Sequence, residues 1–171
     1  LLGSIDMLVE RGAQLVVLGS GDAALEDALR AAAHKHPRHV ALRRGYDEAL
    51  SHRIFAASDV TLVPSRFEPC GLTQMYALRY GTLPIVRRVG GLADTVVDAD
   101  VADGATGFVF DTATPAAFER CVLRALDTLR AAPKAWREMQ RRAMAQVLSW
   151  EGPAKRYLAL YQAALGSHAV P

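Results

Sequence analysis

Short apolar runs that alternate with longer helical segments restrict the fold of this chain more than any other feature. The apolar runs lie at residues 13–18, 39–42, 60–64, 83–86 and 107–110. Segments with helical periodicity or composition lie at residues 1–11, 23–34, 47–58, 71–80, 114–130, 133–148 and 153–165. Strands that alternate with helices build βαβ units, in which helices cover both faces of a buried parallel sheet. The sequence therefore predicts the α/β class, with a Rossmann-like parallel sheet and helices on both faces.

Capping and turn residues support several of these boundaries. Asp22 stands where a helix N-cap is expected, and Pro115 lies in the first turn of the segment that follows it. Gly81 ends residues 71–80 at the position where helices favour glycine. Residues 98–106 are the one long stretch that the pattern leaves as a loop.

Composition excludes several classes of function. The 171 residues suit one domain, and 51% hydrophobic with 22% charged residues allow a buried core. A net charge of +2 does not indicate a nucleic-acid partner, which needs clustered positive charge. No apolar run reaches the length of about 18 residues that a membrane span requires, so we expect no membrane partner. Cys70 and Cys121 form neither a CxxC pair nor a disulfide framework, which favours a cytoplasmic location.

The glycine-rich turn at residues 19–24 fits the pattern GxGxxA that binds dinucleotides. That pattern also requires an acidic residue about 20 positions further on, to hold a ribose. Here the first carboxylate of that region is Asp47, so a tight strand-to-helix turn is the better interpretation. The amides near Gly19 could still approach a ligand.

Three histidines, His34, His36 and His39, stand close together in the sequence. Residues two apart on a helix do not share a face, and Pro37 interrupts the segment. We therefore interpret them as a solvated helix end and predict no metal site.

The segment SRFEPCGLTQMY, residues 65–76, is the strongest candidate for a functional site. It follows the strand that ends at Pro64, and ligands of open α/β folds bind at the carboxyl ends of the strands. Gly71, Leu72 and Thr73 would present N–H groups at a helix start, where the helix dipole favours phosphate. The Thr73 hydroxyl adds a donor. The segment therefore predicts a site for a diphosphate.

Two charged residues, Arg66 and Glu68, stand just before this predicted anion site. A carboxylate repels a phosphate, so its natural use here is to bind sugar hydroxyls. On the residues alone, a helix cap at Glu68 and a surface charge at Arg66 are the favoured interpretation. Tyr46 follows a glycine after another predicted strand, and by itself it could be a packing residue.

Residues 65–96, SRFEPCGLTQMYALRYGTLPIVRRVGGLADTV, resemble the signature of bacterial glycogen synthases and plant starch synthases. The similarity extends to LVVLGSGD at residues 15–22, GYDEALSHR at 45–53, GATGFVF at 104–110 and the pair Ser149-Trp150. It covers nearly the whole chain. The resemblance implies a GT-B arrangement of two Rossmann-like domains facing across a cleft, and the chain resembles only the second, C-terminal one.

The resemblance also implies roles for single residues. Glu68 matches an active-site glutamate that binds the hydroxyls of the donor glucose. The segment formed by Cys70, Gly71, Leu72 and Thr73 matches the backbone that meets the glucose and the distal phosphate. Tyr46 matches an aromatic residue that stacks on adenine. We also include Arg66 and Tyr76 in the predicted donor site.

Tyr76 stands eight residues after Glu68, where many related transferases carry a second glutamate that contacts the ribose. The change to tyrosine is expected for glycogen synthases. Arg87 and Arg88 follow a predicted strand near the same edge, and both a ligand role and simple ion pairing stay open for them. Gly90 and Gly91 are expected in a loop, with Asp94 and Thr95 starting the next element.

By this resemblance, the expected activity is the transfer of glucose from ADP-glucose to the non-reducing end of an α-1,4-glucan, with retention and release of ADP. No cofactor or metal is implied beyond the donor ADP-glucose. We expect residues 1–171 to be the donor-binding domain, without its first strand, its basic loop and the N-terminal acceptor domain, and inactive alone. The alternatives are a non-catalytic module that binds ADP or a nucleotide sugar, and a GT-B transferase that uses another nucleotide sugar.

Overall fold

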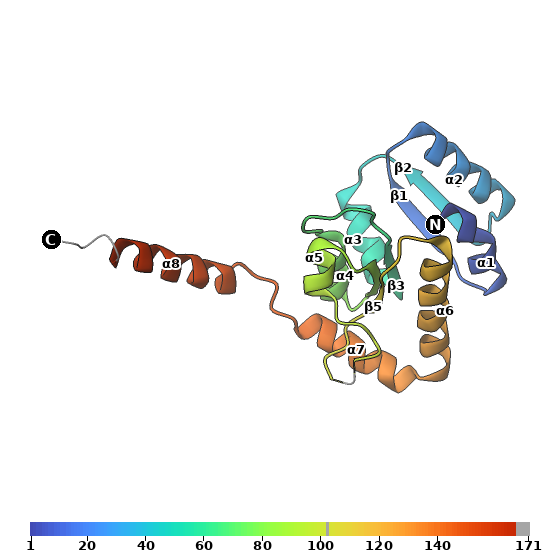
Figure 1. Cartoon of the computed structure of the whole chain (residues 1–171). Coiled ribbons are helices and arrows are strands. Elements are labelled where there is room, and N and C mark those ends of the chain that lie inside the picture. Colours follow the sequence, from blue (N-terminus) through green and yellow to red (C-terminus); the bar gives the residue numbers. More distant parts are fainter. Residues whose placement is uncertain (102, 167–171) are drawn as a thin grey trace.

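The computed structural model describes residues 1–101 and 103–166 (Figure 1). Its strands are β1 (Leu15–Gly19), β2 (Val40–Arg44), β3 (Val60–Val63), β4 (Leu83–Arg87) and β5 (Phe108–Phe110). Its helices are η1 (Leu2–Ser4), α1 (Ile5–Glu10), α2 (Ala23–Lys35), α3 (Glu48–Ala57), α4 (Thr73–Tyr80), α5 (Gly90–Thr95), α6 (Pro115–Ala131), α7 (Pro133–Ala145) and α8 (Glu151–Gly166). The alternation of strands and helices confirms the α/β class and the Rossmann-like fold.

Every strand pair in the described residues is parallel, but the strands form two sheets. β1 pairs with β2, with Val16 opposite Ala41. β4 lies between β3 and β5 in the second sheet, where Ile85 is opposite both Leu62 and Phe108. β1 and β3 do not pair with each other, so each sheet presents an edge toward the other.

The core lies around β4, whose first four residues are all buried. Leu83, Ile85 and Val86 are at most 1% exposed, as expected for a parallel strand with a neighbour on each side. Phe108 of β5 is also fully buried, and its ring stacks on Trp136 of α7 at 5.8 Å. Aromatic pairs of this kind add to the free energy gained by burying apolar area. This packing holds β5, and through it β4, against α7.

Two local predictions near the site need correction. Helix α4 begins at Thr73, and Gly71 precedes it with a φ of +74°, a conformation that favours glycine. Gly90 and Gly91, expected in a loop, form the first turn of α5, and Thr95 ends that helix instead of starting an element. Glycine disfavours a helix in isolation, and α5 exists because tertiary packing outweighs that preference.

Asp98 and Arg124 form an ion pair that ties the segment after α5 to α6. The Arg124 guanidinium donates two hydrogen bonds to the Asp98 carboxylate, at 2.8 and 2.6 Å, and the Asp98 side chain is 11% exposed. Burial by itself raises the pKa of Asp98. The hydrogen bonds from Arg124 and from the N–H groups of Asp100 and Val109 outweigh burial, so the pKa of Asp98 lies below its ordinary value.

We expect Asp98→Asn to lower the free energy of unfolding at pH 7 by on the order of 1–3 kcal/mol, because charge-assisted hydrogen bonds are lost. The folded-state pKa of Asp98 lies below its unfolded value of about 3.9. Its contribution is therefore fully present above about pH 4 and is lost as pH falls through the folded pKa. Urea unfolding between about pH 2 and 7 should show a shallower acid loss in the variant than in the wild type.

The control for this prediction is Asp127→Asn, which changes an exposed carboxylate on the same helix as Arg124. It should leave the unfolding free energy nearly unchanged. Equal stability and equal acid dependence of Asp98→Asn and wild type would contradict the assignment.

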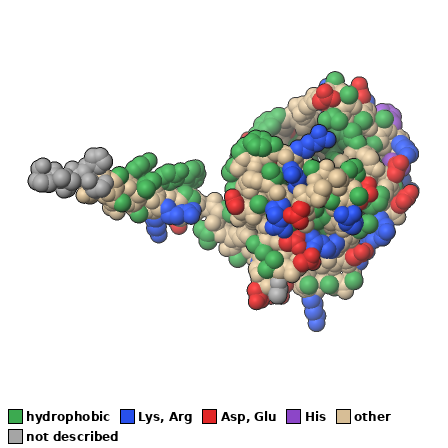
Figure 2. Space-filling view, in the orientation of Figure 1, with side chains coloured by type: hydrophobic (Ala, Val, Ile, Leu, Met, Phe, Trp, Pro, Cys, Tyr) green, Lys and Arg blue, Asp and Glu red, His purple; other side chains and the backbone are tan. Residues whose placement is uncertain are grey.

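Helix α8 extends away from the rest of the molecule (Figure 1). Apolar side chains line it over much of its length in Figure 2, and the most exposed is Leu165, at 75%. Its exposed large apolar residues are Tyr157, Leu158, Leu160, Tyr161 and Leu165. Among the described helices, none is long and apolar enough to cross a membrane.

Candidate functional site

The predicted site lies on the loop between β3 and α4, where β3 ends. Leu72 is the N-cap residue of α4 and makes no side-chain capping hydrogen bond. The N–H groups of residues 72–75 are the first four of the helix, and such groups have no acceptor within the helix itself. Cys70, Leu72 and Thr73 are exposed, so this turn faces solvent. A ligand can reach the amides that the sequence assigned to phosphate.

Arg87 holds the loop between β3 and α4 in place near Arg66. Its Nη1 donates to the carbonyl oxygen of Arg66 at 2.7 Å, and its Nε donates to the carbonyl oxygen of Asp111 at 3.1 Å. Arg88 instead pairs with the Asp111 carboxylate at 2.6 Å. Of the two interpretations left open for these arginines, the geometry favours bracing and ion pairing over direct ligand contact.

Helix α5 packs its first turn directly against the middle of the loop. The Gly91 N–H donates to the carbonyl oxygen of Pro69 at 3.2 Å. A Cβ on Gly90 would lie 1.8 Å from the carbonyl oxygen of Glu68, and one on Gly91 would lie 2.2 Å from that of Cys70. Only glycine allows the two backbones to approach this closely. The two glycines therefore fix the path of the chain around Glu68.

Gln74 is a site residue that the sequence argument did not single out. It is fully buried, and its Nε2 lies 3.1 Å from the Cys70 carbonyl oxygen and 2.8 Å from that of Gly71. It also lies 3.2 Å from Oγ1 of Thr95, and the Thr95 hydroxyl in turn donates to the Gly91 carbonyl oxygen at 2.6 Å. One amide group thus joins the loop to α5.

No periodicity signal could have revealed this role, because Gln74 resembles an ordinary polar residue in the first turn of a helix. The available signal was its place directly after the glycine-containing segment at residues 71–73. Polar side chains at such places often hydrogen-bond nearby backbone groups.

Glu68 is half-buried beside the helix start. The Ser65 hydroxyl lies 3.5 Å from its Oε2, at the limit of a hydrogen bond. Within residues 1–101 and 103–166, no ion pair involves the Glu68 carboxylate. Its acceptor oxygens therefore remain available for the hydroxyl groups of a ligand.

The two predicted aromatic residues occupy different surroundings. Tyr46 follows β2 and is 88% exposed, which leaves its ring free to stack on a flat ligand. Tyr76 lies on α4, and its ring contacts His52 at 5.8 Å and Phe55 at 6.1 Å. Tyr76 therefore packs against α3 with one part of its ring and is 47% exposed overall.

The other motifs have structural partners. The Gly21 N–H donates to Glu26 at 3.0 Å, and Glu26 pairs with Arg44 at 2.5 Å, which supports the interpretation of a tight turn. His36 contacts Asp6, while His34 and His39 contact backbone carbonyls. Within the part of the chain that the structure describes, no group of three or more His, Cys, Asp or Glu could hold a metal ion.

Comparisons with known proteins agree on one family. Residues 1–143 match the family described as Glycosyl transferases group 1. The chain is 53% identical to a glycogen synthase of Haemophilus influenzae (strain PittGG) and 55% identical to one of Edwardsiella ictaluri (strain 93-146), each over 166 residues. These alignments cover 95% of this chain and 35% of each relative, so the chain spans about a third of their length.

A solved structure agrees as well. The catalytic domain of starch synthase IV from Arabidopsis thaliana, bound to ADP and acarbose, superposes with a TM-score of 0.86 at 36% identity. That comparison covers 96% of this chain and 35% of the starch synthase chain. The resemblance of residues 65–96 to glycogen and starch synthases is thus confirmed by whole-chain comparison. The chain belongs to the group 1 glycosyl transferases.

Proposed function

We propose that residues 64–76 bind the donor sugar and the diphosphate of ADP-glucose. The observation that supports this proposal best is the solvent-facing start of α4, whose amides suit an anion. The half-buried Glu68 precedes this helix start by a few residues. A diphosphate at residues 71–73 would place the attached sugar next to Glu68. Tyr46 would stack on the adenine, and Arg66 and Tyr76 would border the same site.

The longer protein that contains this chain would then be a retaining glucosyltransferase. It would transfer glucose to the non-reducing end of an α-1,4-glucan and release ADP, as a glycogen or starch synthase does. Residues 1–171 supply the donor-binding half, while the glucan is bound by parts of the protein outside them. In this proposal the donor substrate is the only small molecule required, and no resident cofactor takes part.

The chemical role of the site is electrostatic. As the bond between glucose and diphosphate breaks, negative charge develops on the leaving diphosphate. Amides fixed at a helix start stabilise this charge without reorganising during the reaction. The braces from Arg87, Gln74 and α5 hold those amides and Glu68 in one arrangement. We further propose a cytoplasmic location, since Cys70 and Cys121 are free thiols.

Calorimetric titration with ADP and UDP tests this proposal. We expect the full-length protein to bind ADP at least about tenfold more tightly than UDP, a difference of about 1.4 kcal/mol. The isolated chain should bind ADP weakly and transfer no glucose. Tyr46→Ala should weaken ADP binding by about tenfold, since base stacking on an aromatic side chain contributes about 1–3 kcal/mol.

The matched control for the titration is Tyr161→Ala, which removes an exposed tyrosine from the distant helix α8. Its ADP affinity should equal that of the wild type. Equal affinity for ADP and UDP would favour a transferase that uses another nucleotide sugar. Nucleotide binding without glucosyl transfer by the full-length protein would favour the non-catalytic module.

A further inference from the structure

The backbone at the start of α4 has the form of an anion-binding nest. Gly71 has a φ of +74°, whereas Leu72 has a φ of −104° and a ψ of −27°. Two successive residues whose backbones turn in opposite senses bring neighbouring N–H groups to one side, where they can surround an anion. Among the described residues, the N–H groups of Gly71, Leu72 and Thr73 donate to no acceptor. These three donors are therefore available to a ligand.

The side chain of Gln74 lies on the buried side of this nest. It is fully buried, and its Nε2 lies within 3.2 Å of three oxygens: the carbonyl oxygens of Cys70 and Gly71, and Oγ1 of Thr95. The Thr95 hydroxyl donates its hydrogen to the Gly91 carbonyl oxygen, so toward Gln74 it can only accept. All three oxygens thus require a donor, which is the NH₂ group of the amide and not its oxygen.

The geometry of the peptide bond converts these contacts into a direction for the N–H groups. In a planar trans peptide, the carbonyl and the N–H point in opposite directions, and the described residues contain no cis peptide bond. The Cys70 carbonyl shares its plane with the Gly71 N–H, and the Gly71 carbonyl shares its plane with the Leu72 N–H. Because Gln74 holds both carbonyls toward the interior, both N–H groups point toward solvent, on the side where Cys70 and Leu72 are exposed.

The oxygen of the same amide shows that packing alone does not explain a glutamine at this place. Oε1 of Gln74 is buried and has no hydrogen-bond partner among the described residues. A buried acceptor without a partner costs free energy, and an apolar side chain of similar shape avoids that cost. Methionine is unbranched and of similar length, so it could fill the space. The distinctive contribution of Gln74 is therefore its NH₂ group.

We infer that Gln74 is a positioning residue for the donor site. By holding the two carbonyls behind the nest, it turns the N–H groups of Gly71 and Leu72 toward the ligand. The inference rests on the proposed function, in which these amides meet the diphosphate of ADP-glucose. Gln74 is buried beneath the loop and acts only through the backbone. Without its NH₂ group the two peptide planes can rotate, because Gly71 has a wide choice of backbone angles, and the N–H groups lose their common direction.

Titration of the full-length protein with ADP and with adenosine tests this inference. Both ligands carry the base that is proposed to stack on Tyr46, but only ADP carries a diphosphate for the nest. We expect Gln74→Met to weaken ADP binding by about tenfold or more, because a hydrogen bond to a charged group contributes at least about that factor. Adenosine affinity should stay within about twofold of wild type. Calorimetry measures the Kd for ADP, and saturation-transfer NMR measures the weaker binding of adenosine.

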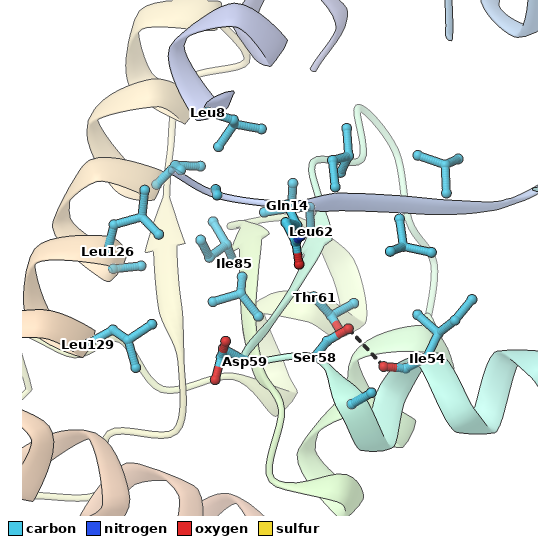
Figure 3. A pocket seen from close by; sticks show the side chains of 18 of the residues that line it. Leu8, Gln14, Ile54, Ser58, Asp59, Thr61, Leu62, Ile85, Leu126 and Leu129 are labelled. Atoms are coloured by element: carbon cyan, nitrogen blue, oxygen red, sulfur yellow. Dashed lines mark hydrogen bonds between the residues drawn. The ribbon is translucent and has the colours of Figure 1, made fainter. Parts of the chain in front are cut away.

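Gln140→Met is the matched control, because Gln140 braces the opposite end of the same helix. Its Nε2 donates to the carbonyl oxygen of Gly81 at 2.8 Å. Neither glutamine lines the apolar cavity of about 670 Å³ between β1 and β3, which Figure 3 shows with Leu62 and Ile85 beside it. Neither substitution therefore alters the packing around that cavity. Gln140→Met should leave the affinities for ADP and adenosine equal to those of the wild type.

A second substitution keeps the test decisive if Gln74→Met does not fold. Thr95→Val preserves the shape of the side chain but removes the hydroxyl that accepts from Nε2 of Gln74. It should weaken ADP binding by about two- to tenfold and leave adenosine binding unchanged.

Three outcomes would overturn the inference, and they differ in what they say of the proposed function. Wild-type ADP affinity in the Gln74→Met and Thr95→Val proteins would overturn the inference alone and leave the diphosphate site intact. A parallel loss of ADP and adenosine affinity would assign Gln74 to general stability instead of positioning. A wild-type protein that binds ADP no more tightly than adenosine would overturn the diphosphate site, and the inference with it.

Discussion

Glu68→Ala in the full-length protein is expected to lower glucosyl transfer on the order of a thousandfold while the protein still folds and binds ADP. Removing one preorganised polar group from a transition-state site typically costs a factor of about 10²–10³. The proposed role of Glu68 is to hold the sugar, so the loss should fall on kcat more than on ADP affinity. Its side chain has only a weak contact to Ser65, so its removal should cost little stability.

Three measurements check this prediction: kcat with ADP-glucose and an α-1,4-glucan, the Kd for ADP, and the free energy of unfolding. Glu48→Ala is the control, because it also removes a carboxylate, here an exposed one in the first turn of α3. Glu48 stands two residues after Tyr46, which is proposed to stack on the adenine. Its turnover should stay within a few-fold of wild type. A fully active Glu68→Ala protein would show that the motif has been misassigned.

Gly90→Ala is expected to disrupt the site and to lower the free energy of unfolding by about 2–4 kcal/mol. Two costs add. The φ of Gly90 is +47°, a conformation that L side chains rarely adopt, and the new Cβ would lie 1.8 Å from the Glu68 carbonyl oxygen. That neighbour is backbone and cannot rotate away, so α5 or the loop around Glu68 must move. ADP affinity should fall together with stability.

Gly21→Ala is the matched control for this substitution. Gly21 lies at the turn after β1, its φ is outside the left-handed region, and no atom lies within 4 Å of the Cβ that would be added. Its unfolding free energy and ADP affinity should be nearly unchanged. Urea unfolding and calorimetry measure both quantities, and a Gly90→Ala protein with wild-type stability would contradict the close approach.

The elements that could be predicted from the sequence are those with a strong local signal. β4 is a continuous apolar run because it is buried on both faces, and α6 has a Thr114 cap that accepts from the Ala117 N–H, with proline in its first turn. Helix α5 was missed because its two glycines disfavour a helix locally. Its first turn is stabilised by packing against a loop about twenty residues earlier in the chain, which no local pattern can indicate.

The candidate site shows the same division. The motif at residues 65–76 could be found in the sequence, because glycine, threonine and a carboxylate beside a helix start are chemically suited to a sugar diphosphate. The bracing of this motif by Arg87 and Gln74 could not be found, because it depends on hydrogen bonds between segments that meet only after folding. Those bonds also favour bracing over ligand contact at Arg87.

The sequence by itself determined the α/β class, the order of strands and helices, and the segment that carries the chemistry, because these depend on periodicity and residue type. Only the tertiary structure decided which strand edges pair. The apolar runs of β1 and β3 look alike in sequence to strands with two neighbours. Among the described residues, however, β1 pairs only with β2 and β3 pairs only with β4. Strand pairing depends on hydrogen bonds between segments that are far apart in the sequence and meet only in the folded protein, so no local pattern indicates it.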